Sequence, residues 1–196
     1  MIKRMFDIIM SILGIFFLSP ILLIIAILIK LDSKGPILYL QKRVGKNNHD
    51  FFIYKFRTMY VDADKKGLLT LGDKDPRVTH IGQFLRKFKL DELLQLFNVL
   101  KGDMSFVGPR PEVRKYVNFY SKDDLKILEV KPGITDYASI AFRDEAELLK
   151  KADNPEEYYI SEIMPAKIKL NMNYIDRPYL ITDIKIILKT LFKIMS

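Results

Sequence analysis

Two adjacent carboxylates, Asp91 and Glu92, stand at the head of a short apolar segment, in a setting that suits chemistry on a charged substrate. Cations lie on both sides of the pair, at Arg86, Lys87, Lys89 and Arg110. Nearby cations favour the ionised form of a carboxyl group, so we expect the pair to be ionised at neutral pH. An ionised aspartate can attack phosphorus, and a carboxylate can help to hold Mg²⁺. The segment therefore indicates phosphoryl chemistry.

The acid pair also has a purely structural interpretation, which the residues alone leave open. Neighbours on a helix project about 100° apart, so Asp91 and Glu92 are not expected to form a face-to-face carboxyl dyad. Asp91 could cap the helix that follows it, and Glu92 could complement the positive end of the helix dipole. Asp91 would then share one helix face with Gln95 and Asn98, a polar stripe in an otherwise apolar segment.

Arg110 lies between Pro109 and Pro111 in the segment GPRP. Proline fixes the backbone φ angle, so this segment is stiff. A guanidinium group presents a planar fork of donors that fits phosphate oxygens. We therefore expect Arg110 to bind a phosphate group.

The composition limits the partners and metal ions that the chain can use. Its 196 residues, 49% of them apolar, suffice for one cored domain with an appendage. The formal net charge of +8 indicates an anionic partner: nucleic acid, an anionic membrane surface or a phosphorylated substrate. The chain has no cysteine and only two histidines, His49 and His80, so any metal is expected to be a hard ion with oxygen ligands, such as Mg²⁺.

An uncharged run over residues 8–29 is about long enough to cross a bilayer as one helix. Ser19-Pro20 interrupts it near its centre, where proline kinks a helix and the serine hydroxyl can bond a freed carbonyl. Basic residues flank both ends, at Lys3, Arg4, Lys30 and Lys34. Because such residues tend to stay cytoplasmic, we favour a re-entrant helix over 1–34 that enters and leaves one leaflet. A kinked spanning helix is the alternative.

Residues 35–196 are predicted to form an α+β cytosolic domain, mostly helical with one small β-hairpin. The hairpin strands are expected at 37–40 and 51–59. Lys55 and Arg57 share a face of the second strand, where an anion site and a solvated face fit equally well. Helices are expected at 81–88, 90–100, 112–120 and 123–130, with Gly102 as a stop signal. A turn at 131–135, a strand at 136–143 and charged helices up to residue 173 follow.

The last segment, 179–196, has the pattern of a basic amphipathic helix after a break at 176–178. Lys185, Lys189 and Lys193 recur at four-residue intervals, opposite apolar side chains. This pattern suits a helix that lies on an anionic membrane surface. Packing against the core of the domain explains it equally well.

Six short motifs, in their order and spacing, carry a family resemblance over essentially the whole chain. They are the Ser19-Pro20 break, QKRVG at 41–45, KFRTM at 55–59, LDELLQLFN at 90–98, GPRP at 108–111 and PGIT at 132–135. The chain resembles the small monotopic phosphoglycosyl transferases of the bacterial sugar transferase family.

The resemblance implies a reaction and a location. Such enzymes move a phospho-sugar from a UDP-sugar to polyprenol (undecaprenyl) phosphate and release UMP, with Mg²⁺, at the cytoplasmic face of the bacterial inner membrane. The product would enter polysaccharide or glycoprotein assembly. The Ser19-Pro20 break matches the one that makes the family's membrane helix re-entrant. A homodimer is one possible assembly, and the sequence leaves the oligomeric state open.

The resemblance also assigns roles to residues. Asp91 would be the nucleophile of a ping-pong reaction, and Glu92 would assist the lipid phosphate or bind the metal ion together with Asp91. Arg86 and Arg110 match the family's phosphate-binding arginines. Further substrate contacts are expected from Gln41, Arg43, Lys55, Arg57, Pro109, Pro111, Thr135 and Arg143.

The chain departs from the family pattern in two places. Many relatives continue after PGIT with GWAQVNGR, whereas this chain has DYASIAFR at 136–143. That region is expected to touch the nucleotide or the sugar, so the sugar cannot be inferred. Relatives often carry an acid two or three residues before the tyrosine that corresponds to Tyr174, where this chain has Asn171.

Two other classes of function compete with this interpretation. A non-enzymatic, membrane-anchored module that binds lipid or a protein would explain the basic surface and both membrane-seeking ends. It would not explain why Asp91, Glu92 and Arg110 occur together. Nucleic-acid binding draws on net charge alone, and the chain contains no recognisable module for it.

Overall fold

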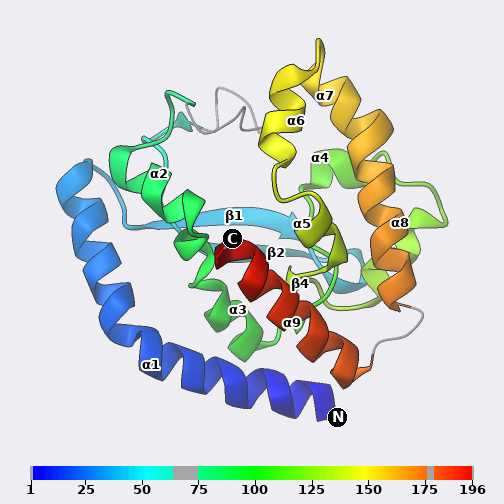
Figure 1. Ribbon diagram of the computed structural model, residues 1–196, viewed down its shortest axis with the longest axis horizontal. Coiled ribbons are helices and arrows are strands. Elements are labelled where there is room, and N and C mark those ends of the chain that lie inside the picture. Colours follow the sequence, from blue (N-terminus) through cyan, green and yellow to red (C-terminus); the bar gives the residue numbers. More distant parts are fainter. Residues whose placement is uncertain (1, 64–74, 176–178, 196) are drawn as a thin grey trace.

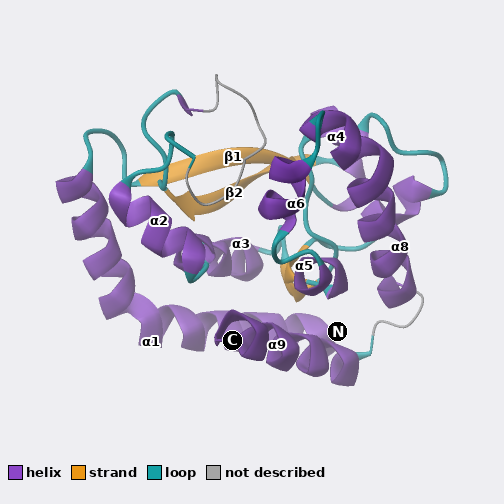
Figure 2. Cartoon of the chain, turned by 45° about the horizontal axis from the view of Figure 1, so that its top comes forward, coloured by secondary structure: helices purple, strands orange, loops and turns teal. Residues whose placement is uncertain are grey.

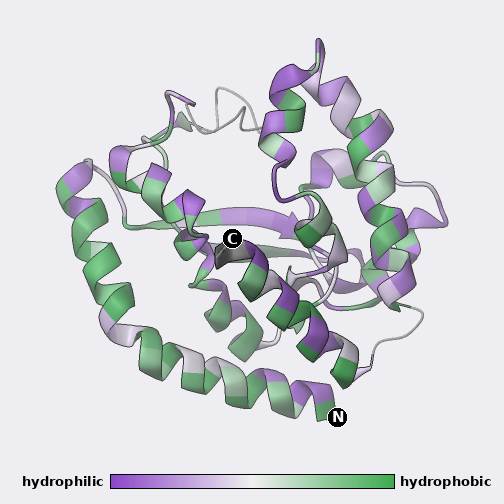
Figure 3. Ribbon diagram, viewed as in Figure 1, coloured by the Kyte–Doolittle hydropathy of each residue, from purple (hydrophilic) through white to green (hydrophobic). Residues whose placement is uncertain are grey.

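The N-terminal helix α1 (Ile2–Asp32) bends around one side of the molecule (Figure 1). The computed structural model describes residues 2–63, 75–175 and 179–195. Within these ranges, α1 is the one helix long and apolar enough to cross a membrane. Apolar residues predominate along α1 (Figure 3), and many of its exposed side chains are apolar. A long apolar N-terminal helix is therefore confirmed.

Residues near the middle of α1 account for its bend. Pro20 lies inside the helix, where it cannot donate a backbone hydrogen bond and crowds the preceding turn. Ser19 Oγ donates to the carbonyl oxygen of Phe16 over 2.8 Å. The hydroxyl thus binds a carbonyl of the interrupted turn, as the sequence predicts.

Strands β1 (Leu38–Val44) and β2 (Asp50–Phe56) form an antiparallel hairpin, which confirms the predicted one. The short 3-10 turn η1 (Lys46–Asn48) connects them. Asn47 and Asn48 have positive φ angles of 55° and 63°, a conformation that asparagine tolerates better than most residues. The first strand is longer than predicted, because pairing continues through Val44 up to this turn.

The predicted helix over 90–100 is two elements. After α2 (His80–Lys87), Lys89 adopts a left-handed φ of 56° and the chain enters the 3-10 turn η3 (Leu90–Glu92). Helix α3 (Gln95–Lys101) begins only then, and Gly102, with a φ of 100°, follows its end as predicted. The acid pair therefore lies in a tight turn between two helices.

Asn98 fixes α3 against the hairpin. Its Oδ1 accepts from the backbone N–H of Tyr54 over 2.9 Å, and its Nδ2 donates to the carbonyl oxygen of Phe52 over 2.7 Å. Asn98 thus bonds backbone groups of β2 on the edge that does not pair with β1. The polar stripe expected on this helix thus includes a structural anchor.

Strands β3 (Ser105–Val107) and β4 (Gly133–Thr135) pair in parallel and bring the segments GPRP and PGIT together. The approach needs glycine, since a Cβ atom on Gly133 would lie 2.1 Å from the backbone nitrogen of Gly108. The region predicted as a turn at 131–135 therefore contains a strand.

The rest of the described chain after β3 is mostly helical (Figure 1). The elements are α4 (Arg114–Val117), η4 (Asp124–Glu129), α5 (Tyr137–Ala141), α6 (Glu145–Lys151), α7 (Pro155–Tyr158), the π-helical turn η5 (Tyr159–Ile163), α8 (Met164–Ile175) and α9 (Leu180–Met195). The helices predicted at 112–120 and 123–130 are shorter than expected. The strand predicted at 136–143 is wrong: Asp136 accepts from the backbone N–H of Ser139 and caps α5. The break predicted at 176–178 lies outside the described residues.

Helix α9 has two apolar faces. Ile186 is fully buried on the inner face, beside the buried Asp183. A stripe of exposed apolar side chains runs along the outer face and consists of Ile181, Ile184, Leu188, Leu191 and Phe192. Both α1 and α9 lie along the same side of the molecule (Figure 2).

Polar side chains join α1 to the rest of the molecule at both of its ends. Near the N-terminus, Arg4 donates to carbonyl oxygens at the end of α3, and the buried Asp7 accepts from the Phe106 backbone N–H over 3.1 Å. At the other end, Asp32 accepts from the Ile81 backbone N–H over 3.3 Å. The two halves of α1 are therefore held by the same domain.

Candidate active site

A cleft of about 1180 Å³ contains the acid pair. Its wall includes apolar side chains of α1, among them Met10, Leu13, Phe17 and Leu18. Residues of β1, β2, η3, α5, α8 and α9 also line it. The cleft therefore connects the apolar helix to the charged residues singled out in the sequence.

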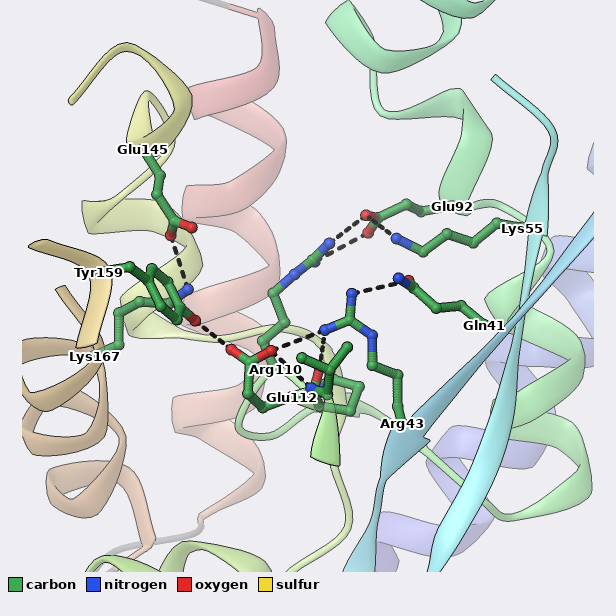
Figure 4. Close-up of polar contacts among 11 residues, drawn as sticks. Gln41, Arg43, Lys55, Glu92, Arg110, Glu112, Glu145, Tyr159 and Lys167 are labelled. Atoms are coloured by element: carbon green, nitrogen blue, oxygen red, sulfur yellow. Dashed lines mark hydrogen bonds and ion pairs between the residues drawn. The ribbon is translucent and has the colours of Figure 1, made fainter. Parts of the chain in front are cut away.

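Glu92 is the centre of a partly buried ion cluster (Figure 4). Its Oε2 accepts from Arg110 Nη1 over 3.1 Å, and its Oε1 accepts from both Arg110 Nη2 and Lys55 Nζ. Burial alone would raise the pKa of Glu92, but the charges of Arg110 and Lys55 outweigh it and hold this pKa well below its usual range. Glu92 is therefore an ionised carboxylate that binds two cations at once.

Asp91 lies in different surroundings. Burial, and then the charge of Glu92, raise the pKa of the Asp91 carboxyl, although Lys55, Arg86 and Lys89 oppose this shift. The expectation that cations would favour ionisation thus holds for Glu92, whereas the pKa of Asp91 shifts the other way. Oδ1 of Asp91 is buried and has no hydrogen-bond partner among the described residues. Such an atom is available to a ligand of the cleft.

The backbone of Arg110 is held as firmly as its side chain. Its N–H donates to Oδ2 of Asp136 over 2.6 Å, and the carbonyl of the preceding Pro109 accepts from the Gly133 N–H over 3.1 Å. The charge of Glu92 raises the pKa of Arg110 above its ordinary value. Arg110 is thus a fixed cation whose fork already faces a carboxylate.

A second polar cluster continues from Arg43 (Figure 4). Arg43 donates to Glu112 Oε1 over 3.0 Å and to Gln41 Oε1 over 2.8 Å. Glu112 also accepts from the hydroxyl of Tyr159 in η5. This cluster fixes the segment after Pro111 between β1 and the C-terminal helices.

The other predicted substrate contacts have mixed positions. Arg86, Pro111, Thr135 and Arg143 line the cleft. Arg57 also belongs to its wall, but its guanidinium donates to the backbone carbonyls of Ser33 and Lys34 just beyond α1. Pro109 does not line the cleft and borders a smaller pocket. For Arg57 and Pro109 the geometry indicates a structural contribution, and their contact with substrate stays a prediction.

A cluster of three acidic or histidine side chains that could hold a metal ion by itself does not occur in the described ranges. The residues present nevertheless fit Mg²⁺. Asp91 offers a buried carboxylate oxygen that no described protein group binds. Mg²⁺ in proteins is usually held by one or two carboxylates plus substrate phosphates, so Asp91 would suffice beside a diphosphate. Glu92 would have to exchange a bond to Arg110 or Lys55 in order to bind the ion as well.

Several polar residues of the site were not found from the sequence. Glu112, Tyr159, Glu145 and Lys167 belong to this group, and Lys167 donates to Glu145 over 2.8 Å (Figure 4). Asp136 and Asn171 were noticed only as departures from a family pattern, yet Asn171 Nδ2 donates to Asp136 Oδ2 over 2.9 Å. The two departures from the family pattern could have pointed to this part of the site, because Asp136 and Asn171 bond each other.

Comparisons with known proteins show the family of the chain. The family model described as "Bacterial sugar transferase" matches residues 1–196. The chain is 40% identical over 198 residues to a UDP-N-acetylgalactosamine-undecaprenyl-phosphate N-acetylgalactosaminephosphotransferase of Aeromonas hydrophila, covering 100% of this chain and 44% of that protein. It is 36% identical over 197 residues to the UDP-glucose:undecaprenyl-phosphate glucose-1-phosphate transferase of Escherichia coli, covering 98% of this chain and 40% of that one.

A further similarity covers part of the chain. Over 111 residues it is 50% identical to a putative undecaprenyl-phosphate N-acetylgalactosaminyl 1-phosphate transferase of Bacillus subtilis, covering 57% of this chain and 62% of that protein. The chain thus spans less than two thirds of the length of each of these three relatives. From the match over its whole length, the chain belongs to the bacterial sugar transferase family.

Proposed function

We propose that this protein transfers a phospho-sugar from a UDP-sugar to a polyprenyl phosphate such as undecaprenyl phosphate, releasing UMP. The observation that carries the proposal is the pairing of Asp91, which has a free buried carboxylate oxygen, with the Glu92–Arg110–Lys55 cluster in one cleft. The names of the relatives describe the same class of reaction. The product would be a polyprenyl-diphosphate sugar for glycan assembly.

In the first step, an oxygen of the Asp91 carboxylate attacks the phosphorus that carries the sugar. A bond forms between that oxygen and phosphorus, the bond from phosphorus to the UMP phosphate oxygen breaks, and UMP leaves. Arg110 and Lys55 supply positive charge beside the acid pair, where charge accumulates on the phosphoryl oxygens. The free position of Asp91 Oδ1 supports its role as nucleophile.

In the second step, a phosphate oxygen of the polyprenyl phosphate attacks the same phosphorus. The bond from phosphorus to Asp91 breaks, which regenerates the carboxylate and gives the diphosphate product. Glu92, ionised and bound to two cations, keeps Arg110 and Lys55 in place through both steps. Asp91 would hold Mg²⁺ together with the substrate phosphates, and the ion would neutralise phosphate charge when it is bound.

We also propose that α1 is re-entrant and that the domain sits on the cytoplasmic face of the inner membrane. The attachment of α1 to one domain through Arg4 and Asp7 near its start and Asp32 at its end supports this topology. The exposed apolar stripe of α9, with Lys185 and Lys189 exposed beside it, supports contact with an anionic bilayer surface. Apolar α1 side chains in the cleft wall support entry of a lipid substrate from that side.

The test is UMP release by detergent-solubilised protein with undecaprenyl phosphate, Mg²⁺ and a panel of UDP-sugars. We expect one or a few sugars to give UMP, and both a chelator and Asp91→Asn to abolish the signal. Incubation with the UDP-sugar in the absence of the lipid should leave a phospho-sugar bound to the wild-type protein. Mass spectrometry would detect it as a mass increase that Asp91→Asn lacks.

Each alternative has its own outcome. A folded protein that binds lipid vesicles but releases no UMP with any sugar would favour the non-enzymatic membrane module. Turnover that persists in Asp91→Asn would retain the enzyme and reject Asp91 as nucleophile. Turnover that survives the chelator would reject the role of Mg²⁺.

A further inference from the structure

Unpartnered polar atoms gather in the cleft. Six buried side-chain nitrogen or oxygen atoms lack a hydrogen-bond partner among the described residues, and five of them belong to residues that line this cleft. A buried polar atom without a partner is rare and destabilising, so its native partner is usually a ligand or an ordered water. Two of the five, Ser139 Oγ and Asn171 Oδ1, lie away from the acid pair in sequence, on α5 and α8.

Asp136 holds these two residues together. Its fully buried carboxylate accepts from the Ser139 backbone N–H through Oδ1 and from Asn171 Nδ2 through Oδ2. The orientation of the Asn171 amide follows from this contact, because only its NH₂ group can donate to a carboxylate. Asn171 Oδ1 is therefore the atom left without a partner, in a side chain that is 3% exposed.

The same carboxylate ties this pair to the reacting centre. Asp136 Oδ2 also accepts from the backbone N–H of Arg110, whose guanidinium holds Glu92. The Asp136 carboxylate therefore bonds Ser139, Asn171 and Arg110 at the same time. Both residues also line the cleft that contains the acid pair.

The hydrogen-bonding properties of Ser139 Oγ and Asn171 Oδ1 limit which ligand groups can bind them. Asn171 Oδ1 can only accept a hydrogen bond, and Ser139 Oγ can donate or accept. A phosphate dianion has no hydrogen to donate to Asn171. A sugar ring carries hydroxyl groups, and in some sugars an acetamido N–H, that can serve both atoms. The uracil N–H is a donor as well, but the ribose and a second phosphate separate it from the phosphorus under attack.

We infer that Ser139 and Asn171, positioned by Asp136, form the subsite that binds the sugar of the donor and sets which UDP-sugar is used. This inference rests on the proposed function. The ligand class is a hexose whose hydroxyl or acetamido group donates to Asn171 Oδ1 while Ser139 Oγ bonds a neighbouring oxygen or N–H. Since a site built to bond such groups discriminates against analogues that lack them, changing these atoms changes selectivity.

The experiment compares wild type with Ser139→Ala in the UMP-release assay. The donors are UDP-hexoses that differ at C2, as hydroxyl or acetamido, and at C4, as epimers. Alanine keeps the backbone N–H that donates to the capping carboxylate of Asp136 and removes only Oγ. We expect kcat/KM for the preferred donor to fall about tenfold, with a smaller fall for the poor donors, so that the ratio between them narrows.

The control and a second variant keep the result interpretable. Ser161→Ala alters an exposed serine that does not line the cleft, and should retain the wild-type ratio. Asn171→Ala removes the other free atom while Asp136 keeps its bonds to Arg110 and Ser139, and should narrow the ratio in the same direction. Circular dichroism checks that each variant is folded.

Three results would overturn the assignment. An unchanged ratio in both variants would mean that the free atoms bind only water. If kcat/KM fell equally for every donor and UMP inhibited more weakly, the two atoms would bind uracil. If kcat/KM fell equally and inhibition by UMP were unchanged, the two atoms would have a structural role. No UMP from wild type with any donor would instead remove the proposed function itself.

Discussion

At the scale of single residues, Asp91 and Glu92 are neighbours in the chain, but the pKa values of their carboxyl groups shift in opposite directions. Arg110 and Lys55 both bind Glu92, so its negative charge is compensated in a partly buried position. Asp91 is also buried, yet one of its oxygens has no partner among the described residues. A buried charge without a partner destabilises the folded state, and such sites are typical of functional groups.

The first prediction concerns the stability of Asp91→Asn. The pKa of Asp91 in the folded state is raised above its ordinary value, the one expected in the unfolded chain. Below that ordinary pKa the carboxyl is protonated in both states and contributes nothing. As the pH rises from the ordinary pKa to the raised one, the carboxyl ionises in the unfolded chain before it does in the folded protein. Stability is therefore lost over this range, and the loss is complete above the raised pKa. The neutral amide of the variant has no such loss, so we expect Asp91→Asn to be about 1 kcal/mol more stable than wild type at neutral pH.

Thermal unfolding in detergent, followed by circular dichroism, measures this effect. The gain should vanish at a pH below the ordinary pKa of aspartic acid. Asp153→Asn removes the same charge from an exposed position and should change little at either pH. A variant that is less stable than wild type at neutral pH would show that ionised Asp91 is stabilising, contrary to this account.

The second prediction concerns Arg110→Lys. An ammonium group keeps the charge but cannot bond both carboxylate oxygens of Glu92 in one plane. We expect kcat to fall on the order of a hundredfold, because the cation beside the acid pair is no longer fixed. Arg114→Lys is the matched control, since Arg114 bonds Asn48 and Asp50 and does not line the cleft. Equal activity of the two variants would argue against a fixed fork at Arg110.

At the scale of elements, Asn98 links α3, which follows the acid pair, to β2, which carries Lys55. We predict that Asn98→Ala lowers the free energy of unfolding by about 2 kcal/mol, because it removes two hydrogen bonds from a fully buried site. Denaturation in detergent measures the difference. Asn118→Ala, at an exposed position, should stay near wild type. If Asn98→Ala left the free energy of unfolding unchanged, the backbone of β2 would have found other hydrogen-bond partners.

Elements defined by local signals could be predicted from the sequence, and those that depend on distant partners could not. The hairpin was predicted because its turn residues and alternation are adjacent in the chain. Strand β4 was taken for a turn, because it pairs with β3, about 28 residues away, and a three-residue parallel pair leaves little local pattern. The segment 136–143 looked like a strand, but Asp136 caps a helix there.

The same distinction applies to the site. Asp91, Glu92, Arg110 and Lys55 were singled out because each lies in a motif. The fold joins Glu92, Arg110 and Lys55 in one ion cluster, and Asp91 lines the same cleft. Glu112 and Tyr159 meet only because η5 packs against the segment after GPRP, 47 positions away in the chain. Both stand in charged or aromatic stretches, PRPEVRKY and PEEYYI, but neither stretch indicates the other as its partner. Contacts of this kind can be found only once the packing is known.

At the scale of the whole molecule, α1 is bound to elements that position the candidate site. Arg4 bonds the carbonyl end of α3, and Asp7 bonds the backbone of β3. These two elements flank the acid pair and Arg110 in the chain. Lys3 additionally joins the start of α1 to Asp183 of α9. The two helices along one side of the molecule (Figure 2) are thereby coupled to the position of the site.

The last prediction follows from this arrangement. If both ends of α1 are bound to one domain, they lie on one side of the membrane, and neither end is reachable from the other side. The chain has no cysteine, so a single introduced cysteine is a unique label site. We expect Ile2→Cys to react with a membrane-impermeant thiol reagent only after the cells are permeabilised, as Lys151→Cys in the exposed part of α6 should. Labelling of Ile2→Cys in intact cells would require α1 to cross the bilayer. The contacts of Arg4 and Asp7 would then have to break in the membrane, and the re-entrant topology would be rejected.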